Sequence, residues 1–228
     1  MILRRWDDLP EYMKVPEVRP YYDILQKRRL SLLVKRVFDF VLALFLLIVL
    51  AVPMALIAVW VKQDSEGPVF YRQERVTTYG KHFHIHKFRT MVSNADKIGS
   101  AVTVGHDSRI TKVGQKLRRI RLDELPQVFD VLEGNMSFVG TRPEAVKYVE
   151  QYRPEYYATL LMPAGITSNT SIRFKEENRL LSDAQNVDRV YMEQILPEKM
   201  RYNLQDICQF SLLKDVKTMT QTVLSGLR

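Results

Sequence analysis

One uncharged run, FVLALFLLIVLAVPMALIAVWV at residues 40–61, constrains this chain more than any other feature. Its roughly 22 residues are enough for a helix to cross the hydrocarbon core of a bilayer. Pro53 lies just past its middle. The run is too long, lies too deep in the chain and lacks a small-residue cleavage site, so we do not interpret it as a signal peptide.

Basic residues flank this run on both sides. They are Lys27, Arg28, Arg29, Lys35 and Arg36 before it, and Lys62, Arg72, Arg75 and Lys81 after it. Since a spanning helix keeps its Lys/Arg excess on the cytoplasmic side, two positive flanks favour a re-entrant helix that enters the membrane, breaks at Pro53 and returns. Each half would be about 12 residues, too short to span alone. Two alternatives remain: a proline-kinked spanning helix and a buried core helix.

The composition narrows the class of partner. A net charge of +8 fits nucleic acid, anionic lipid headgroups or phosphorylated substrates. The membrane run favours lipid and phosphorylated substrates, because juxtamembrane Lys and Arg gain about 1 kcal/mol each at an anionic leaflet. We therefore expect no nucleic-acid partner. Cys208 is the only cysteine, which excludes an internal disulfide and a thiolate metal cluster.

The chain divides into a basic N-terminal arm at 1–34, a re-entrant membrane helix at 35–62 and a cytoplasmic catalytic domain at 63–228. We expect the proline-punctuated arm to be a loosely structured segment on the membrane surface, or a floppy tail, with a short helix near 21–30. Asp39 follows Lys35 and Arg36 by one turn, a spacing at which they can pair.

The catalytic domain is predicted to hold one small hairpin and several helices. Strands at 69–71 and 83–88 are joined through 77–80. A helical pattern begins at Val113 and runs to Gly134, with further helices at 144–161 and 183–196. The fold class is therefore α+β, mostly helical, with a re-entrant, proline-broken membrane helix, a β-hairpin and amphipathic interfacial helices.

The last predicted helix begins at Ser211, a suitable N-cap. Its apolar residues fall on one face, and they are Leu212, Leu213, Val216, Met219, Val223 and Leu224. This stripe either packs on the core or lies in the membrane interface.

Asp123 and Glu124 are the first candidates for chemistry. Adjacent acids are common on solvated helices, but a basic cluster lies directly upstream and would hold an anion beside this pair. The cluster consists of Lys116, Arg118, Arg119 and Arg121. Pro126 follows at once, which favours a place at a helix start, where backbone N–H groups attract phosphate. A carboxylate in this setting can attack phosphorus, and its neighbour can hold Mg²⁺.

Further cations lie elsewhere in the sequence. Arg142 stands between Gly140 and Pro143 on a stiff turn that suits bidentate grip of a phosphate, although a surface arginine in a turn is an equal alternative. Lys87 and Arg89 flank an aromatic residue, and a strand with a charged outer face would explain them as well.

His82, His84 and His86 alternate, so all three point to one face of a strand and could chelate a transition metal. A solvent-facing strand surface is the favoured interpretation, since no acidic or cysteine ligand lies nearby. The sequence has no P-loop, no G-x-G-x-x-G, no G-x-S-x-G and no zinc signature.

Several motifs follow one another in a fixed order. They are KRVFD (35–39), GPVFYRQER (67–75), KFRTM (87–91), DSRIT (107–111), LDELPQ (122–127), NMSFVGTRPE (135–144) and PAGIT (163–167). In these motifs, over about residues 31–225, the chain resembles the bacterial sugar transferases, small monotopic phosphoglycosyl transferases that start membrane glycoconjugate assembly. Together the motifs are highly specific, although no single one would be.

The resemblance implies a reaction. A sugar 1-phosphate passes from a UDP-sugar to a polyprenol (undecaprenyl) phosphate through a covalent aspartyl intermediate, with release of UMP, at the cytoplasmic face of the bacterial inner membrane. It implies that Asp123 is the nucleophile and that Glu124, with Asp123, serves Mg²⁺ or the incoming lipid phosphate. The substrate-binding residues that it implies are Lys87, Arg89, Arg109, Arg118, Arg142 and Pro143. The re-entrant helix broken at Pro53 is also a family trait.

Two departures from the family pattern leave the sugar open. Thr141 stands where the family has the first proline of Pro-Arg-Pro, and Ser168 where it has glycine. The polyprenol length, the pathway product and a homodimer are open as well. The alternative functions are a non-catalytic basic module that recruits partners to the membrane, and a single-pass anchor with its enzyme domain outside the cell.

Overall fold

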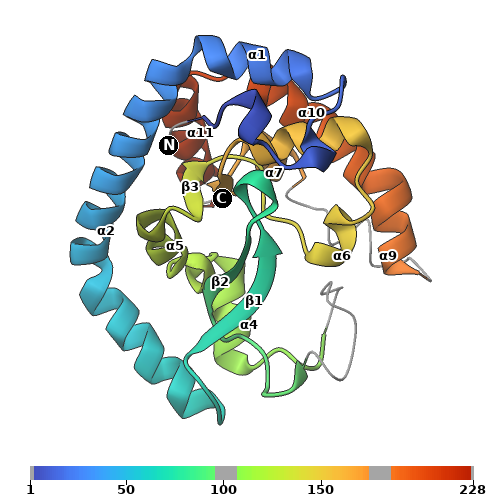
Figure 1. The fold of residues 1–228 in the computed structure, drawn as a ribbon. Helices are drawn as coiled ribbons and strands as arrows, with labels where there is room; N and C mark the ends of the chain where they lie inside the picture. The colour runs from blue at the N-terminus through green and yellow to red at the C-terminus, as the bar shows by residue number, and fades with distance from the viewer. Residues whose placement is uncertain (1–2, 96–106, 175–185, 227–228) are drawn as a thin grey trace.

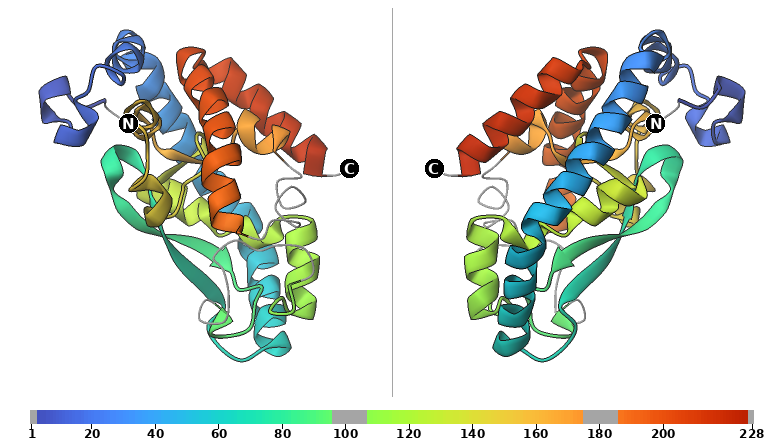
Figure 2. Two further views of the ribbon diagram at one scale, coloured as in Figure 1. Left: turned by 90° about the vertical axis from the view of Figure 1, so that its right-hand side faces the viewer. Right: turned by 90° about the vertical axis from the view of Figure 1, so that its left-hand side faces the viewer.

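The computed structural model describes residues 3–95, 107–174 and 186–226, and one long helix dominates them. This helix, α2, runs unbroken over Arg29–Asp64 with Pro53 inside it. It forms a bowed rod along one side of the molecule (Figure 1) and lies across one whole face (Figure 2). The predicted interruption at Pro53 is therefore wrong, because a proline removes one helical hydrogen bond without necessarily ending the helix. The helix also extends beyond residues 35–62 at both ends.

α2 is long and apolar enough to cross a membrane, with a mean hydropathy of 3.1 in its most apolar window. Only 17% of that window is buried, which contradicts the alternative of a buried core helix. The buried residues recur on one face from end to end, and they are Leu32, Lys35, Asp39, Ala43, Met54, Ile57 and Val61. The rest of the protein therefore covers α2 at both of its ends.

Residues 3–28 pack on the domain, so the prediction of a loose arm or floppy tail is wrong. Two 3-10 helices, η1 (Trp6–Asp8) and η2 (Glu11–Met13), precede α1 (Arg19–Lys27), which confirms the short helix predicted there. The buried apolar residues of this segment are Leu3, Leu9, Met13, Val18, Tyr22 and Leu25. They share a core with tyrosines of the C-terminal half, and this burial offsets the ordering of a polar, proline-rich segment.

The predicted hairpin is confirmed. β1 (Phe70–Val76) pairs antiparallel with β2 (His82–Phe88) through the turn η3 (Thr78–Gly80). A second pair, β3 (Met136–Val139) and β4 (Ala164–Thr167), is parallel. Sequence reasoning missed it, because both strands are short and buried and show no alternation of polar and apolar residues.

The helix predicted from Val113 to Gly134 is three separate elements. α4 (Lys112–Arg119) ends before Arg121, whose φ of 56° is left-handed. The 3-10 turn η4 (Leu122–Glu124) follows, and Pro126 caps α5 (Gln127–Glu133). Gly134 ends α5 with a φ of 85°, as predicted. The chain direction changes at η4 because a left-handed residue and a proline stand on either side of it.

The C-terminal half is helical but more broken than predicted. α6 (Val146–Val149) and the 3-10 helix η5 (Pro154–Leu161) replace the predicted helix at 144–161, and α7 (Asn169–Arg173) follows β4. α9 (Val187–Val190), a π-helical turn (Tyr191–Ile195) and α10 (Leu196–Cys208) follow each other directly. They cover the described part of the helix predicted at 183–196, whose first residues lie outside the described ranges.

α11 (Leu212–Gly226) confirms the last predicted helix and its N-cap, since the Ser211 hydroxyl accepts the Lys214 N–H at 3.2 Å. Its apolar stripe remains largely open: Leu213 is 85% exposed and Val223 64%. The stripe does not pack on the core as a whole, which leaves the interfacial interpretation as a prediction.

A closed group of charges joins α11 to α2. The Lys35 Nζ atom lies 2.6 Å from Asp215 Oδ2 and 3.8 Å from Asp39 Oδ2, and the other Asp39 oxygen accepts the Phe138 N–H. These three charged side chains are almost fully buried. The predicted pairing of Asp39 with Lys35 is thus confirmed, and Arg36 instead donates to the carbonyls of Val131 and Leu132 at the end of α5.

Candidate active site

η4 holds Asp123 and Glu124 at the point where α4, α5 and the end of β2 meet. Neither acid lies inside a regular helix, because Arg121 and Pro126 separate this turn from α4 and α5. The prediction that the pair precedes a helix start is confirmed. Both side chains are half-buried, so the turn presents them at the surface of the domain rather than in its core.

Glu124 is clamped between two cations. Lys87 Nζ and Arg142 Nη2 both donate to its Oε1 atom, each at 2.9 Å. Burial by itself would raise the pKa of Glu124, but the charges of Lys87 and Arg142 outweigh it and hold the pKa well below its usual range. Three residues that are far apart in the sequence, on β2, on η4 and after β3, are thereby brought together as predicted.

Asp123 is in a different state from its neighbour. Among the residues that the structure describes, no cation forms an ion pair with its carboxylate. Burial, followed by the adjacent charge of Glu124, raises the pKa of Asp123 above its ordinary value, and Lys87 and Arg118 oppose this shift from a distance. A partly desolvated carboxylate of raised basicity beside several cations is a nucleophile suited to an anionic electrophile.

Asp107 links two further arginines near the acids, Arg118 and Arg109. Arg118 Nε donates to the Thr90 hydroxyl at 2.7 Å, and burial lowers the pKa of Arg118 while Asp123 and Asp107 counter that effect. Arg109 is held by Asp107, with Nη2 to Oδ2 at 2.6 Å. Asp107 thus fixes Arg109, and the charges of Asp107 and Asp123 both act on Arg118.

Arg89 has another role than the predicted one. Its guanidinium donates to the Ser65 carbonyl at 2.6 Å and to the Glu66 carbonyl, directly after the end of α2. A cation at a helix C-terminus is stabilising because the last carbonyls carry partial negative charge. Arg89 therefore anchors the end of the long helix. Pro53 lies inside α2, far from the two acids in the sequence.

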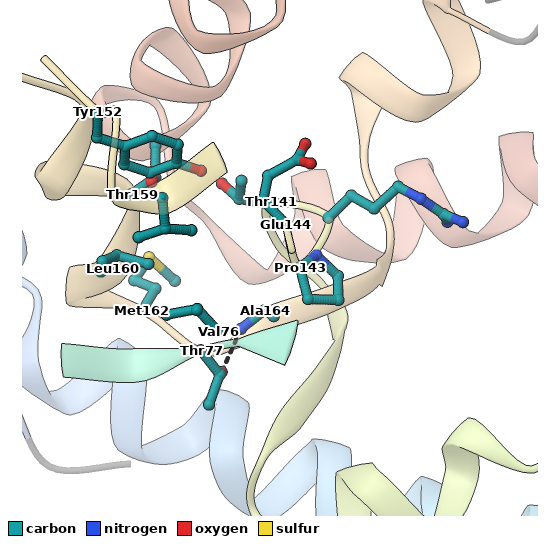
Figure 3. Close-up of a pocket in the computed structure, with 12 residues that line it drawn as sticks. Val76, Thr77, Thr141, Pro143, Glu144, Tyr152, Thr159, Leu160, Met162 and Ala164 are labelled. Atoms are coloured by element: carbon teal, nitrogen blue, oxygen red, sulfur yellow. Dashed lines mark hydrogen bonds between the residues drawn. The ribbon is translucent and has the colours of Figure 1, made fainter. Parts of the chain in front are cut away.

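Pro143 lines a small pocket beside the candidate site. In Figure 3, Pro143 and Glu144 lie on one side of this pocket, and Tyr152 and Leu160 lie on the other. The Thr77 hydroxyl closes it below by accepting the Ala164 N–H at 3.1 Å, the dashed line in the figure. Arg142 lines the same pocket, next to Pro143.

The three alternating histidines do not form one site. His82 and His84 are exposed, and His82 pairs with Glu74 at 3.0 Å. His86 is buried, and its Nδ1 atom lies 2.8 Å from Asp130 of α5. The expectation that no acid lies nearby is wrong for His86, because the strand twists and α5 covers its end. His86, Asp130 and Glu133 have potential ligand atoms within 4.8 Å of one another.

Sequence reasoning missed one cation of this region. The sequence places Arg75 of β1 in the positive flank of the membrane run and at the end of the motif GPVFYRQER, without a role in the site. In the structure it is half-buried, and both Glu144 and Arg142 are close enough to affect its pKa, which burial lowers. The available signal was its position in β1, on the same face as the residue that pairs with Lys87.

Comparison with known proteins agrees with this arrangement. The family described as bacterial sugar transferase matches residues 30–228. The chain belongs to the bacterial sugar transferase family. The match includes all but the first residue of α2 and each of the cations and acids described above.

Individual relatives are similar over much of the chain. The UDP-glucose:undecaprenyl-phosphate glucose-1-phosphate transferase of Escherichia coli K12 is 36% identical over 222 residues, 96% of this chain and 45% of that protein. The corresponding transferase of Caulobacter vibrioides is 34% identical over 192 residues, 83% of this chain and 68% of that protein. A putative undecaprenyl-phosphate N-acetylgalactosaminyl 1-phosphate transferase of Bacillus subtilis is 37% identical over 134 residues, 59% of this chain and 75% of that protein. The chain therefore spans less than half of the E. coli relative and most of the two shorter ones.

Proposed function

We propose that this bacterial sugar transferase moves a sugar 1-phosphate from a UDP-sugar to undecaprenyl phosphate, and that Asp123 carries the phosphosugar between the two substrates. The observation that carries this proposal is the contrast within η4: Glu124 is neutralised by Lys87 and Arg142, whereas Asp123 has no such partner among the described residues. A relative named for transfer of glucose 1-phosphate supports the substrate class.

The chemistry balances in two displacements. In the first, a carboxylate oxygen of Asp123 attacks the phosphorus that bears the sugar, the bond to the bridging oxygen breaks, and UMP leaves with that oxygen. In the second, a phosphate oxygen of the lipid attacks the same phosphorus, and the carboxylate of Asp123 leaves. A covalent intermediate divides one transfer between two poorly miscible substrates into two steps.

The cations of the site have distinct tasks in this scheme. Arg118 and Arg109 offset the charge of the donor diphosphate as it approaches Asp123. Lys87 and Arg142 neutralise Glu124, which keeps a second negative charge from repelling the same diphosphate. The raised pKa of Asp123 makes its ionised form a stronger nucleophile than an ordinary surface aspartate.

The family resemblance implies Mg²⁺, and the donor set fits that ion. Lys87 and Arg142 both bind Oε1 of Glu124, and among the described residues neither its other oxygen nor the Asp123 carboxylate forms an ion pair. Mg²⁺ usually takes one or two carboxylates together with substrate phosphates. Asp123 and Glu124 would hold it, and it would polarise the phosphate oxygens when bound.

We also propose that the middle of the bowed helix α2 lies in the cytoplasmic membrane, with both of its ends on the cytoplasmic side. Both ends of α2 pack on the same domain: Arg36 binds the end of α5, and Asp64 accepts the Val113 N–H at the start of α4. A helix whose two ends touch one folded domain cannot place those ends on opposite sides of a bilayer. The exposed apolar residues from Leu44 to Val52 form the middle of the helix and would enter the lipid.

Intact-protein mass spectrometry tests the reaction. The purified protein is exposed to UDP-glucose or UDP-N-acetylgalactosamine with Mg²⁺ but without lipid phosphate. We expect a mass increase of one sugar phosphate, located on the peptide that contains Asp123, together with release of UMP. Addition of undecaprenyl phosphate should remove the adduct. If neither donor nor a wider panel of UDP-sugars leaves an adduct or releases UMP, the proposal is wrong.

Single-cysteine labelling tests the membrane path. In a Cys208→Ser background, Lys27→Cys and Lys62→Cys place one thiol before and one after the apolar run. We expect both thiols to resist a membrane-impermeant maleimide in intact spheroplasts and to react after permeabilisation. Labelling of one end alone in intact spheroplasts would show a spanning helix and would support the alternative of a single-pass anchor.

The alternative of a non-catalytic recruiting module predicts that Asp123→Asn has no effect, and no observation favours it.

A further inference from the structure

One face of the β1–β2 hairpin carries both Lys87 and Arg75, a cation to which no role has yet been assigned. In the β1–β2 register Tyr71 lies opposite Lys87 and Arg75 lies opposite Phe83. Directly paired residues of an antiparallel ladder share a face, and so do every second residue of a strand. Tyr71, Gln73 and Arg75 therefore line the same face as Lys87, and all three are half-buried.

The end of this face adjoins the turn that carries Arg142. The Val76 N–H donates to the Glu144 carbonyl at 3.1 Å, which ties the residue after Arg75 to the residue after Pro143. α6 lies beside the same end of β1 (Figure 1). Arg75 and Arg142 are close enough for each charge to be felt by the other, since Arg142 contributes to the lowered pKa of Arg75.

Arg75 lacks a compensating charge. Among the described residues its guanidinium makes one hydrogen bond, from Nη2 to Gln73 Oε1, and no ion pair. The nearest acid in its surroundings is Glu144, whose carboxylate is already held by the Tyr191 hydroxyl at 2.6 Å and faces Lys199 at 3.5 Å. A half-buried arginine beside a second arginine, with most of its N–H groups unused, is costly unless an anion completes the site.

We propose that Arg75 binds the phosphate of the nucleoside monophosphate that leaves, as the second cation after Arg142 along the path from Asp123. Arg75 adjoins the turn that carries Arg142, and Arg142 pairs with Glu124, so Arg75 can reach the phosphate next to the attacked one, which is the phosphate that leaves. Gln73 holds the guanidinium by one edge, and the remaining N–H groups form a fork for two phosphate oxygens. This inference rests on the proposed function.

A calorimetric titration of the protein with UMP, without donor or lipid, tests the role of Arg75. We expect Arg75→Gln to weaken UMP binding about 10- to 100-fold, because a charge-assisted pair is lost. In steady state the same variant should raise the KM for the UDP-sugar more than it lowers kcat. A merely structural role would lower the apparent kcat through loss of folded protein and leave the KM unchanged.

Arg72→Gln is the matched control. Arg72 lies on the same strand with the same charge, but on the opposite, exposed face, where it contacts His86. We expect UMP affinity within about twofold of the wild type, because a screened charge on the far face contributes little. Equal losses in Arg72→Gln and Arg75→Gln would overturn the proposal, since they would reflect net charge or strand stability alone.

Arg75→Lys decides the matter if the glutamine variant fails to fold. Lysine keeps the charge and the stem but offers no fork, so we expect an intermediate loss of UMP affinity at an unchanged melting temperature. Wild-type affinity in every folded Arg75 variant would overturn the inference. If the wild type forms the Asp123 adduct and Arg75→Gln binds UMP normally, only this inference fails. If the wild type binds UMP through Arg75 but forms no adduct, only the proposed function fails.

Discussion

Two groups of charges in this protein both combine basic and acidic side chains but are arranged differently. At the junction of α2 and α11, Lys35 sits between Asp215 and Asp39, and a backbone N–H satisfies the remaining Asp39 oxygen. At η4, Lys87 and Arg142 share one acid, Glu124, while the next acid, Asp123, is left without an ion pair among the described residues.

The difference separates a structural group from a reactive one. The Lys35 group is closed, because each of its charges faces another across a few ångströms in a nearly dry environment. The η4 group is open, because it keeps one basic carboxylate and a surplus of cations at a half-exposed surface. A closed group fixes the position of a helix, and an open group can bind an anion and attack it.

The largest expected effect is at the open group. Asp123→Asn keeps the shape of the side chain but removes the nucleophile, so we expect UMP release to fall by at least about 10³-fold. The mass adduct should also disappear, while the melting temperature should change little because no ion pair is lost. Continuous UMP detection and intact-protein mass measure these outcomes. Normal turnover by the amide variant would remove the contrast between the two groups.

The next effect is at the closed group. Lys35→Met leaves Asp39 and Asp215 buried without a cation, and we expect a loss of about 3–5 kcal/mol in unfolding free energy. Thermal melts in detergent report this change, with Lys27→Met, an exposed lysine of α1, as the control. The adduct should still form on the protein that remains folded. If Lys35→Met is stable but no longer forms the adduct, the Lys35 group takes part in the chemistry and the contrast between the two groups is wrong.

Arg142→Lys tests whether the guanidinium of Arg142 in the open group binds the donor as well as neutralising Glu124. The variant keeps a charge beside Glu124 but loses the fork of the guanidinium, so we expect the KM for the UDP-sugar to rise about tenfold. Initial rates over a range of donor concentrations give the value. Arg189→Lys, at an exposed pair with Glu193, should leave the kinetics unchanged. Equal KM values for both variants would mean that Arg142 only neutralises Glu124.

The smallest expected effect is a shift of the pH profile of adduct formation. Asp123 must be ionised to attack, so the rate of adduct formation should fall as the pH drops through its raised pKa. Glu124→Gln removes the neighbouring negative charge and frees Lys87 and Arg142, and both changes lower the pKa of Asp123. We therefore expect the acid limb of the profile to move to lower pH. Glu193→Gln is the control. If the acid limb in Glu124→Gln moves to higher pH, or lies at the same pH as in Glu193→Gln, the charge of Glu124 does not act on Asp123 as proposed.

Much of the fold could be predicted because it depends on local pattern. The hairpin, the cap at Ser211 and the end of α5 at Gly134 follow from alternation and from residues that favour one backbone state. The parallel pair β3–β4 could not be predicted, since its two strands meet only after α6 and η5 have returned the chain. The packing of residues 3–28 was also hidden, because their partners are tyrosines from the other half of the sequence.

The candidate site divides in the same way. The motifs identified Asp123, Glu124, Arg118 and Arg142, but they grouped Arg89 with the substrate-binding residues. The structure places that arginine at the end of α2. Arg75 was passed over because its charge had already been attributed to the membrane flank.

The sequence by itself determined that a long apolar helix is joined to a basic domain and that two adjacent acids stand beside a cluster of cations. It did so because hydrophobic length, charge and residue order are properties of the chain. Only the tertiary structure decided that α2 continues through Pro53, that both its ends pack on one domain, and which acid is neutralised. Those outcomes depend on distances between residues remote in sequence, which set the burial and the pairing of each charge.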